Sequence, residues 1–539
     1  MSSEAKRGAV RIASNYTRLL TNVVLGLVSV KILVEVAGDS GFGLVSTLGA
    51  TTGIANLTEE TVRRSMIREL GSALHNEDRS VFTRVFNTAL LLAGGMSLIT
   101  LSVFGLIMLC LWQGWIFEID PPSLIEAAYW LVAWKAAESV VDVLLSPIIN
   151  VYIASERMRA FNGWMMLQRL ARLAAALGLF FYYGSGADPA TALKTYAMVG
   201  AILYISANLT AALTMMLFVE GRTRPRPWLA RRSELPGLVT VGKWNMAMST
   251  AQNLHLRADQ IITNSLFGLI YNTSFGLAMQ LTSYVRMLTV GMTDGLDAVT
   301  ARLSIKKGEE SVRDLVRHST RLHAFVSIPT GIGMLILAEP ALDVWVGANL
   351  QNRAMVISRA TIIMQIIVLG VTLRAISDGW IRILYGAGHI RSYALPIVAL
   401  SFLNPVVAIV LAKTMPADVA YLGPPIAFSL VTAIISAVVV PLIGGRCLGV
   451  SPWALAAPIV RPGAVAIVSA PILMLAIRYV PSWNLLWLGA TCGAYAMVVT
   501  VLCVQFAMTQ QERQRFSGAI MRRLGRGGGR GRGRGAGRV

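Results

Sequence analysis

Charged residues are scarce in this sequence. Asp, Glu, Lys and Arg make up 14% of the 539 positions, whereas 55% of the residues are apolar. An ordinary soluble domain carries about 25% charged residues. The low share of charge and the mean hydropathy of +0.60 predict an all-α polytopic membrane protein that lies mostly in lipid.

Cysteine is scarce as well. Cys110, Cys447, Cys492 and Cys503 lie in or beside apolar stretches, and their spacing follows no paired pattern. This arrangement indicates neither a disulfide framework nor a metal site. We therefore expect four inert thiols and no cofactor, apart from a coupling H⁺ or Na⁺.

Acidic residues are fewer than basic ones, 28 against 48, so the formal net charge is +20. In a membrane protein most of this excess is expected in cytoplasmic loops, where it sets the orientation and attracts anionic lipid.

Apolar stretches long enough to cross the bilayer, about 20 residues each, recur fourteen times along the chain. They lie at about 12–35, 42–62, 86–112, 123–149, 161–183, 191–219, 243–268, 274–299, 320–346, 355–384, 391–412, 421–443, 454–478 and 484–507. No cleavage pattern of small residues follows the first stretch, so it is expected to stay as a helix.

Lys and Arg in the connections set the orientation. If the N-terminus is cytoplasmic, the basic loops around residues 63–79, 222–232 and 302–313 all fall inside, and the outer loops carry mainly acids. Fourteen spans with both termini in the cytoplasm satisfy this distribution.

The chain also resembles itself. Phe42-Gly43-Leu44 recurs as Phe275-Gly276-Leu277, Trp112-x-Gly114 as Trp345-x-Gly347, and Tyr152-x-Ala154 as Tyr385-x-Ala387, always 233 positions on. Collinear matches at one offset indicate a duplicated module. Six spans separate each motif from its copy, so the copies have the same orientation and form a parallel repeat, as in many transporters.

These boundaries divide the chain into five parts. They are a six-helix bundle at 1–220, a basic cytoplasmic linker at 221–240, a second six-helix bundle at 241–444, two additional helices at 445–510, and a basic Gly/Arg tail at 511–539. The tail is of low complexity, and we expect it to contact lipid headgroups rather than nucleic acid.

Charges inside membrane spans are costly, and a retained one normally faces a partner or a hydrated cavity. The cations at mid-depth, which we predict to line one substrate-binding cavity, are Arg18, Lys31, Lys135, Arg257, Arg286 and Arg374. Arginine suits phosphate because its planar fork offers paired donors. The cavity is therefore expected to bind an anionic, phosphorylated substrate, although single pairs such as Arg374 with Asp378 could simply tie helices together.

Polar residues at helical spacing accompany these cations. The expected polar wall of the cavity consists of Asn15, Asn22, Asn253, His255, Gln260 and Asn264. The intramembrane acids with a possible role in ion coupling are Glu35, Asp259, Asp294 and Asp378. Each acid has a second interpretation as a counter-charge to an arginine, and no second ligand at metal spacing accompanies His255.

The order of motifs resembles the MOP superfamily, and within it the polysaccharide (O-antigen type) flippases. The resemblance depends on Ala37-Gly38-Asp39-x-Gly41-Phe42-Gly43 after the first span, on Asp259-Gln260-Ile261-Ile262 leading to Gly268, and on the two Trp-x-Gly turns. It covers nearly the whole chain and implies two six-helix bundles, plus two terminal helices, around a central cavity.

The resemblance implies an alternating-access flippase that moves oligosaccharide on undecaprenyl pyrophosphate to the outer leaflet of the bacterial inner membrane. Candidate protein partners are a polysaccharide polymerase and glycosyltransferases. One alternative is a multidrug exporter of the same superfamily, for which an acidic lumen is expected. Another is a membrane-embedded glycosyltransferase or polymerase, which needs a sizeable outer loop, whereas the outer connections here are about a dozen residues or fewer.

Overall fold

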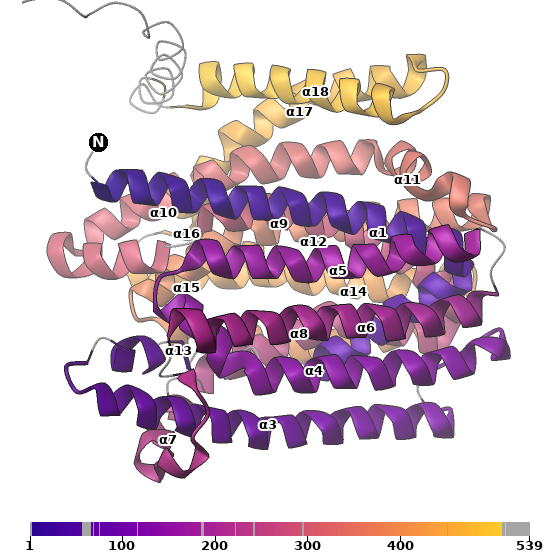
Figure 1. Ribbon diagram of the computed structural model, residues 1–539. Helices are drawn as coiled ribbons and strands as arrows, with labels where there is room; N and C mark the ends of the chain where they lie inside the picture. Colours follow the sequence, from indigo (N-terminus) through magenta and orange to yellow (C-terminus); the bar gives the residue numbers. More distant parts are fainter. Residues whose placement is uncertain are drawn as a thin grey trace, which may run out of the picture.

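The computed structural model describes residues 3–55, 66–67, 69–74, 76–115, 117–184, 188–220, 223–240, 243–293, 296–449, 451–508 and 513. Within these ranges every regular element is a helix, and the long helices run roughly parallel to one another (Figure 1). The predicted all-α fold is confirmed.

The first half of the chain folds into one group of long helices. It consists of α1 (Ser3–Ala55), α3 (Arg79–Gln113), α4 (Ile125–Ala154), α5 (Met158–Tyr183) and α6 (Pro189–Thr214). Helix α1 is bent at Gly38, whose φ of 69° lies in the left-handed region that glycine adopts without strain. The bend turns α1 into two limbs, the first before and the second after Gly38.

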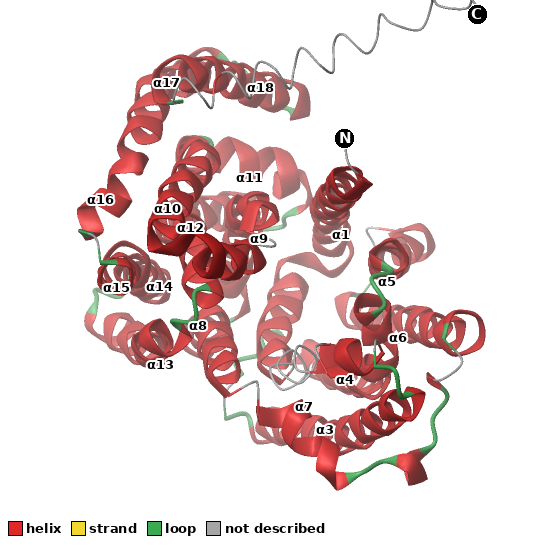
Figure 2. Cartoon of the chain, turned by 90° about the vertical axis from the view of Figure 1, so that its left-hand side faces the viewer, coloured by secondary structure: helices red, strands yellow, loops and turns green. Residues whose placement is uncertain are grey.

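The second half follows the same plan. It contains α8 (Lys243–Phe267), α9 (Leu269–Thr293), α10 (Leu296–Ile336), α11 (Ala338–Val346), α12 (Arg353–Gly386), α13 (Ile390–Thr414) and α14 (Gly423–Ala433), which continues through a π-helical turn into α15 (Val440–Leu448). Seen along the helices, α3–α6 lie on one side of the molecule and α8–α15 on the other (Figure 2).

Two further helices follow the second half. The chain passes through α16 (Pro452–Ala456) to α17 (Val460–Tyr479) and α18 (Leu485–Leu502), which lie along the outside of α10 (Figure 2). Their apolar side chains pack around Leu337, in a cluster with Leu473 and Tyr495.

Ten described helices are long and apolar enough to cross a membrane, and the bent pair formed by Glu310–Ile336 and Ala338–Asn349 would make an eleventh. Helix α1 enters this count once although it has two limbs. The count of fourteen spans is compatible with this result and stays a prediction.

The helix boundaries follow the 233-residue offset. Helix α3 ends at Gln113 and α11 at Val346, while α5 begins at Met158 and α13 at Ile390, one position short of the offset. One difference separates the halves: α3 is continuous, whereas its counterpart bends by 74° between α10 and α11. The bend lies at Leu337, where the two additional helices pack.

The repeated Phe-Gly-Leu motif lies where the halves cross. Phe42, Leu44, Phe275 and Leu277 are buried in one cluster between the second limb of α1 and α9. The glycines of the motif permit this crossing, because a methyl group on Gly43 would overlap the carbonyl oxygen of Leu269 across the interface. The duplication has therefore kept the residues that let the two copies touch.

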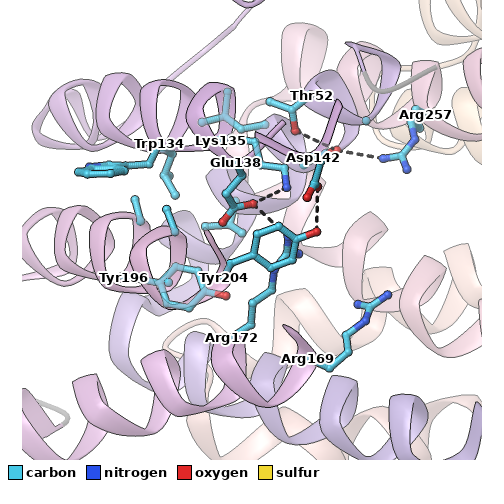
Figure 3. A pocket seen from close by; sticks show the side chains of 18 residues that line it. Thr52, Trp134, Lys135, Glu138, Asp142, Arg169, Arg172, Tyr196, Tyr204 and Arg257 are labelled. Carbon is cyan, nitrogen blue, oxygen red and sulfur yellow. Dashed lines mark hydrogen bonds and ion pairs between the residues drawn. The ribbon is translucent and has the colours of Figure 1, made fainter. Parts of the chain in front are cut away.

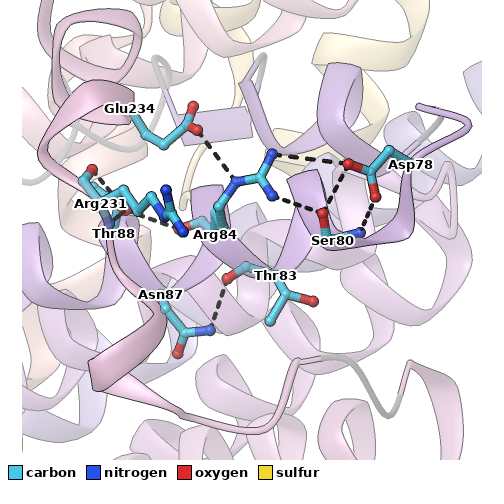
Figure 4. Close-up of polar contacts among 8 residues, drawn as sticks. All are labelled: Asp78, Ser80, Thr83, Arg84, Asn87, Thr88, Arg231 and Glu234. Carbon is cyan, nitrogen blue, oxygen red and sulfur yellow. Dashed lines mark hydrogen bonds and ion pairs between the residues drawn. The ribbon is translucent and has the colours of Figure 1, made fainter.

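The predicted linker is docked onto the first half (Figure 4). The backbone N–H of Arg226 donates to Asn87 Oδ1 at 2.6 Å, and that of Arg231 donates to Thr88 Oγ1 at 3.0 Å. Arg84 of α3 lies 3.8 Å from Glu234 of the linker. The segment before α7 (Leu235–Thr240) thus packs against α3, and its residues Arg224, Arg226, Arg231 and Arg232 are exposed.

Gly43→Ala should destabilise the protein by about 1–3 kcal/mol, the usual cost of overpacking, because the added methyl group meets backbone rather than a movable side chain. Thermal unfolding in detergent would measure the loss as a lower midpoint. The matched control is Gly105→Ala, where the new methyl group has nothing within 4 Å. Equal midpoints for the two variants would show that the crossing is not tightly packed.

Candidate functional site

A cavity in two chambers lies inside the molecule, the larger chamber between the halves and the smaller one within the first half. The larger chamber, about 720 Å³, is bounded mainly by α1, α8, α9 and α12. The smaller one, about 480 Å³, is bounded by α1, α4, α5 and α6. Both are lined by Val45, Gly49, Tyr196 and Arg257, so the chambers adjoin, with Arg257 between them.

A line of hydrogen bonds joins the halves on one side of this cavity. From the bend of α1 inward, Thr273 donates to the Asp39 carbonyl oxygen at 2.6 Å, and Asn272 donates to that of Gly43 at 3.2 Å. Asp39 also accepts from the backbone N–H of Asn352 at 2.8 Å. These contacts close the end of the bundle near Asp39, which the charge distribution predicts to face outward.

The larger chamber contains three of the predicted cations. Arg286 Nε donates to Asp378 Oδ2 at 2.6 Å, so this arginine is already partly neutralised. Arg374 lines the chamber although only 8% of its surface is exposed. Among the described residues, no carboxylate lies within ion-pair distance of its guanidinium. Arg374 is therefore a buried cation that lines the cavity and, among the described residues, is in no ion pair; the nearby carboxylate of Asp378 pairs with Arg286 instead.

Arg257 belongs to both chambers. Its Nη1 donates to the carbonyl oxygen of Gly49 on the opposite half at 3.0 Å. One turn further along α8, Gln260 Nε2 donates to Ser46 Oγ at 3.0 Å, and Asn253 lines the same chamber. The structure thus brings together Arg257, Arg286 and Arg374 with the polar residues Asn253 and Gln260.

The smaller chamber carries a network of charges (Figure 3). Lys135 Nζ and Arg172 donate to the same oxygen of Glu138, at 2.6 Å and 3.0 Å. Asp142 accepts from the Tyr204 hydroxyl at 2.8 Å and from Asn208 at 3.0 Å. The predicted cation Lys135 therefore lies in the wall of the cavity, paired with a carboxylate of its own helix.

Arg169 and Arg172 also line the smaller chamber and were missed by the sequence analysis. Both lie within the fifth predicted span, where the criterion used for the other cations, a charge at mid-depth, identifies them.

Polar residues of α8 form two neighbouring stripes, and the second one, with Gln252, His255, Asp259 and Thr263, faces the interior of the second half instead of the two chambers. His255 is stacked on Phe428 with ring centroids 4.9 Å apart, and its Nε2 lies 2.8 Å from Thr432 Oγ1. Asp259 is fully buried, and both its oxygens accept from Asn404 Nδ2, at 3.1 and 3.0 Å. These side chains are held among α8, α13 and α14.

The remaining predicted residues lie apart. Asn264 donates to the backbone oxygen of Glu118 at 3.0 Å. Lys31 is exposed on the first limb of α1, and Asn22 and Glu35 on the same limb are half-buried; none of the three lines either chamber. Asp294 and the side chains of Asn15 and Arg18 lie outside the described part of the chain.

Known proteins resemble this chain in part of its sequence and in its whole fold. The family described as "Polysaccharide biosynthesis protein" matches residues 190–354. Among curated proteins, none matches the sequence.

Solved structures match over most of the chain. The lipid II flippase MurJ in an inward closed conformation is 12% identical, with a TM-score of 0.63, over 95% of this chain and 99% of that one. An inward-facing multidrug resistance MATE family transporter of the MOP superfamily is 11% identical, with a TM-score of 0.66, over 81% and 98%. The eukaryotic MATE transporter AtDTX14 is 14% identical, with a TM-score of 0.56, over 84% and 98%.

At these identities the structural likeness establishes the fold, and the family match concerns residues 190–354. The chain therefore has the fold of MurJ and of the MATE transporters, and its residues 190–354 are similar to a family of polysaccharide biosynthesis proteins.

Proposed function

We propose that this protein is an alternating-access flippase for a polyprenyl-pyrophosphate-linked oligosaccharide. It moves this cargo from the inner to the outer leaflet of the bacterial cytoplasmic membrane for assembly of a surface polysaccharide, with both termini in the cytoplasm. The observation that carries the proposal is the cavity between the halves, lined by Arg257, Arg286 and Arg374.

The charge of the cavity supports a phosphorylated cargo. A guanidinium offers paired donors that fit the oxygens of a phosphate. Arg374 is in no ion pair among the described residues, and Asp378 pairs with Arg286 through Nε. A diphosphate entering the larger chamber meets these two cations and Arg257. This lining opposes the alternative of an exporter of cationic drugs.

The shape of the cavity supports transport by alternating access. The hydrogen bonds of Asp39 and Gly43 close one end of the interface, while the chambers lie further inward along α1. In this mechanism the sugar and diphosphate occupy the cavity while the prenyl tail stays in the bilayer. Cargo that binds the two states of the interface unequally shifts the population between them.

Arg374→Ala and Arg257→Ala should each abolish export of the lipid-linked sugar, because each removes a cation from the diphosphate path. Arg374→Lys and Arg257→Lys should retain part of it, since lysine keeps the charge and loses the planar fork. The assay is complementation of a flippase-null strain, scored by surface polysaccharide at matched protein level.

The matched control is Arg359→Ala. Arg359 also lies within a predicted span, but its guanidinium lies 3.8 Å from the ring centre of Tyr271 and lines neither chamber. Full export by the two cavity alanine variants, or equal loss in the control, would remove the cations from the proposed cargo path.

We propose in addition that Asp259 carries the coupling H⁺ or Na⁺. It is fully buried between α8 and α13, and among the described residues Asn404 is its side-chain partner, with no cation in ion-pair contact. A buried carboxylate without a counter-charge is costly, so binding a proton or sodium ion there releases a substantial free energy. Asp378, by contrast, is engaged with Arg286.

Asp259→Asn should fold normally, because the amide has the same shape and removes a buried charge. Export should lose its dependence on the ion gradient and fall at least tenfold. Transport into proteoliposomes under imposed proton or sodium gradients would measure this, with Asp343→Asn, at the exposed pair with Arg353, as the control. Gradient-dependent export by Asp259→Asn would exclude Asp259 as the coupling site.

A further inference from the structure

The guanidinium of Arg257, which lines both chambers, occupies the space left by a glycine of α1. Gly49 and Gly53 lie one turn apart on the second limb of α1, opposite Arg257 of α8. A methyl group on Gly53 would overlap Nη1, Cζ and Nε of Arg257, whereas a methyl group on Gly49 would have nothing within 4 Å. The notch at Gly53 is thus filled by the planar end of an arginine from the other half.

The bond made in this notch ends the line of contacts between the halves. Along the second limb of α1, Asp39, Gly43, Ser46 and Gly49 each accept a hydrogen bond from the second half, at intervals that keep them on one helix face. Of these four contacts, Arg257 to Gly49 is the farthest from the bend. It is also the one whose donor carries a full charge and faces both chambers.

We infer that Gly53 is a positioning residue that seats Arg257 as a latch between the halves, and that an anionic cargo releases the latch. The release step rests on the proposed function. The bond from Arg257 to the Gly49 carbonyl has one charged partner, whereas a bond from the guanidinium to a phosphate oxygen has two, and a phosphate can accept from both arms of the planar fork. A diphosphate in the cavity therefore draws the guanidinium away from Gly49. The contact farthest from the bend of α1 is then the first of the four to open.

The latch gives cargo binding a way to bias the interface. Cargo changes the equilibrium between two states only to the extent that it binds them differently. Once Arg257 has left Gly49, cargo that binds its guanidinium stabilises the state in which the hydrogen bonds of Asp39, Gly43 and Ser46 can also break. Arg257 therefore has two roles: it contacts the cargo, and its movement on cargo binding weakens the interface between the halves.

The decisive comparison is Gly53→Ala against Gly49→Ala. The overlap at Gly53 involves the far end of a flexible side chain, so the fold tolerates it while the guanidinium is displaced. Spin labels on Ser123→Cys and Ala348→Cys, exposed positions on opposite halves, report separation near the bend in the full-length protein without its four native cysteines.

Gly53→Ala should raise the ratio of separated to closed molecules about tenfold without cargo, the effect of losing a hydrogen bond to a charged group. Gly49→Ala should leave the ratio unchanged, and Arg257→Ala should match Gly53→Ala. In the double variant the two changes should not add, because the glycine acts through the arginine. Equal ratios for Gly53→Ala and Gly49→Ala, or additive effects in the double variant, would overturn the latch.

Inorganic pyrophosphate tests the release step. It should raise the separated population of the natural sequence and have little effect on Gly53→Ala, in which the latch is already open. If pyrophosphate leaves the natural sequence unchanged although Gly53→Ala shifts it, release by the cargo is refuted while the latch stands. Complementation by the arginine variants tests flippase function separately.

Arg257→Ala provides the same comparison if Gly53→Ala fails to fold. It removes the latch from the other side and leaves the glycine notch intact. A closed interface in a folded Arg257→Ala protein would refute the latch without any change at Gly53.

Discussion

The structure depends on the cost of placing polar groups in lipid. A charge at the centre of a membrane helix costs about 2.5–3.5 kcal/mol on insertion scales, and unsatisfied backbone groups there cost several kcal/mol each. The helices meet this constraint in three ways: pairing, as for Arg286 with Asp378; burial against amides, as for Asp259 with Asn404; and exposure to a cavity, as for Arg374. Charges that face a cavity instead of a partner are found in the two chambers beside α1.

The duplication explains the matching helix ends and crossing glycines of the two halves, but it does not explain the cations of the cavity. Positions 233 apart share helix ends and the glycines at the crossing, since both copies must bend and pack alike. The cavity cations have no such counterparts: the positions that correspond to Arg257, Arg286 and Arg374 are Val24, Gly53 and Val141. The two halves thus share their helical arrangement, but these three cations belong to the second half alone.

One of these unequal pairs links the two halves. Gly53, the counterpart of Arg286, is the residue whose missing side chain makes room for Arg257. The same position therefore supplies a cavity cation in the second copy and, in the first copy, the notch for another cation. The departure from symmetry places both guanidiniums in the larger chamber.

The sequence by itself determined the helical class, the parallel repeat and the existence of a polar, cationic interior. These features follow from composition and from periodicities within single helices, which any lipid environment would impose. The spacing of polar residues in α8 also showed that they lie in two neighbouring stripes along the helix. One consists of Asn253, Arg257, Gln260 and Asn264, and the other of Gln252, His255, Asp259 and Thr263.

Only the tertiary structure decided which stripe lines the cavity. In a helix surrounded by other helices both polar faces avoid lipid, so periodicity cannot say which one faces the cavity and which a neighbour. The rotation of α8 is set by its packing on α13 and α14, which bury Asp259 and His255 and turn Arg257 toward Gly49. The partners of each charge lie up to about two hundred positions away in the chain, beyond the reach of any local pattern.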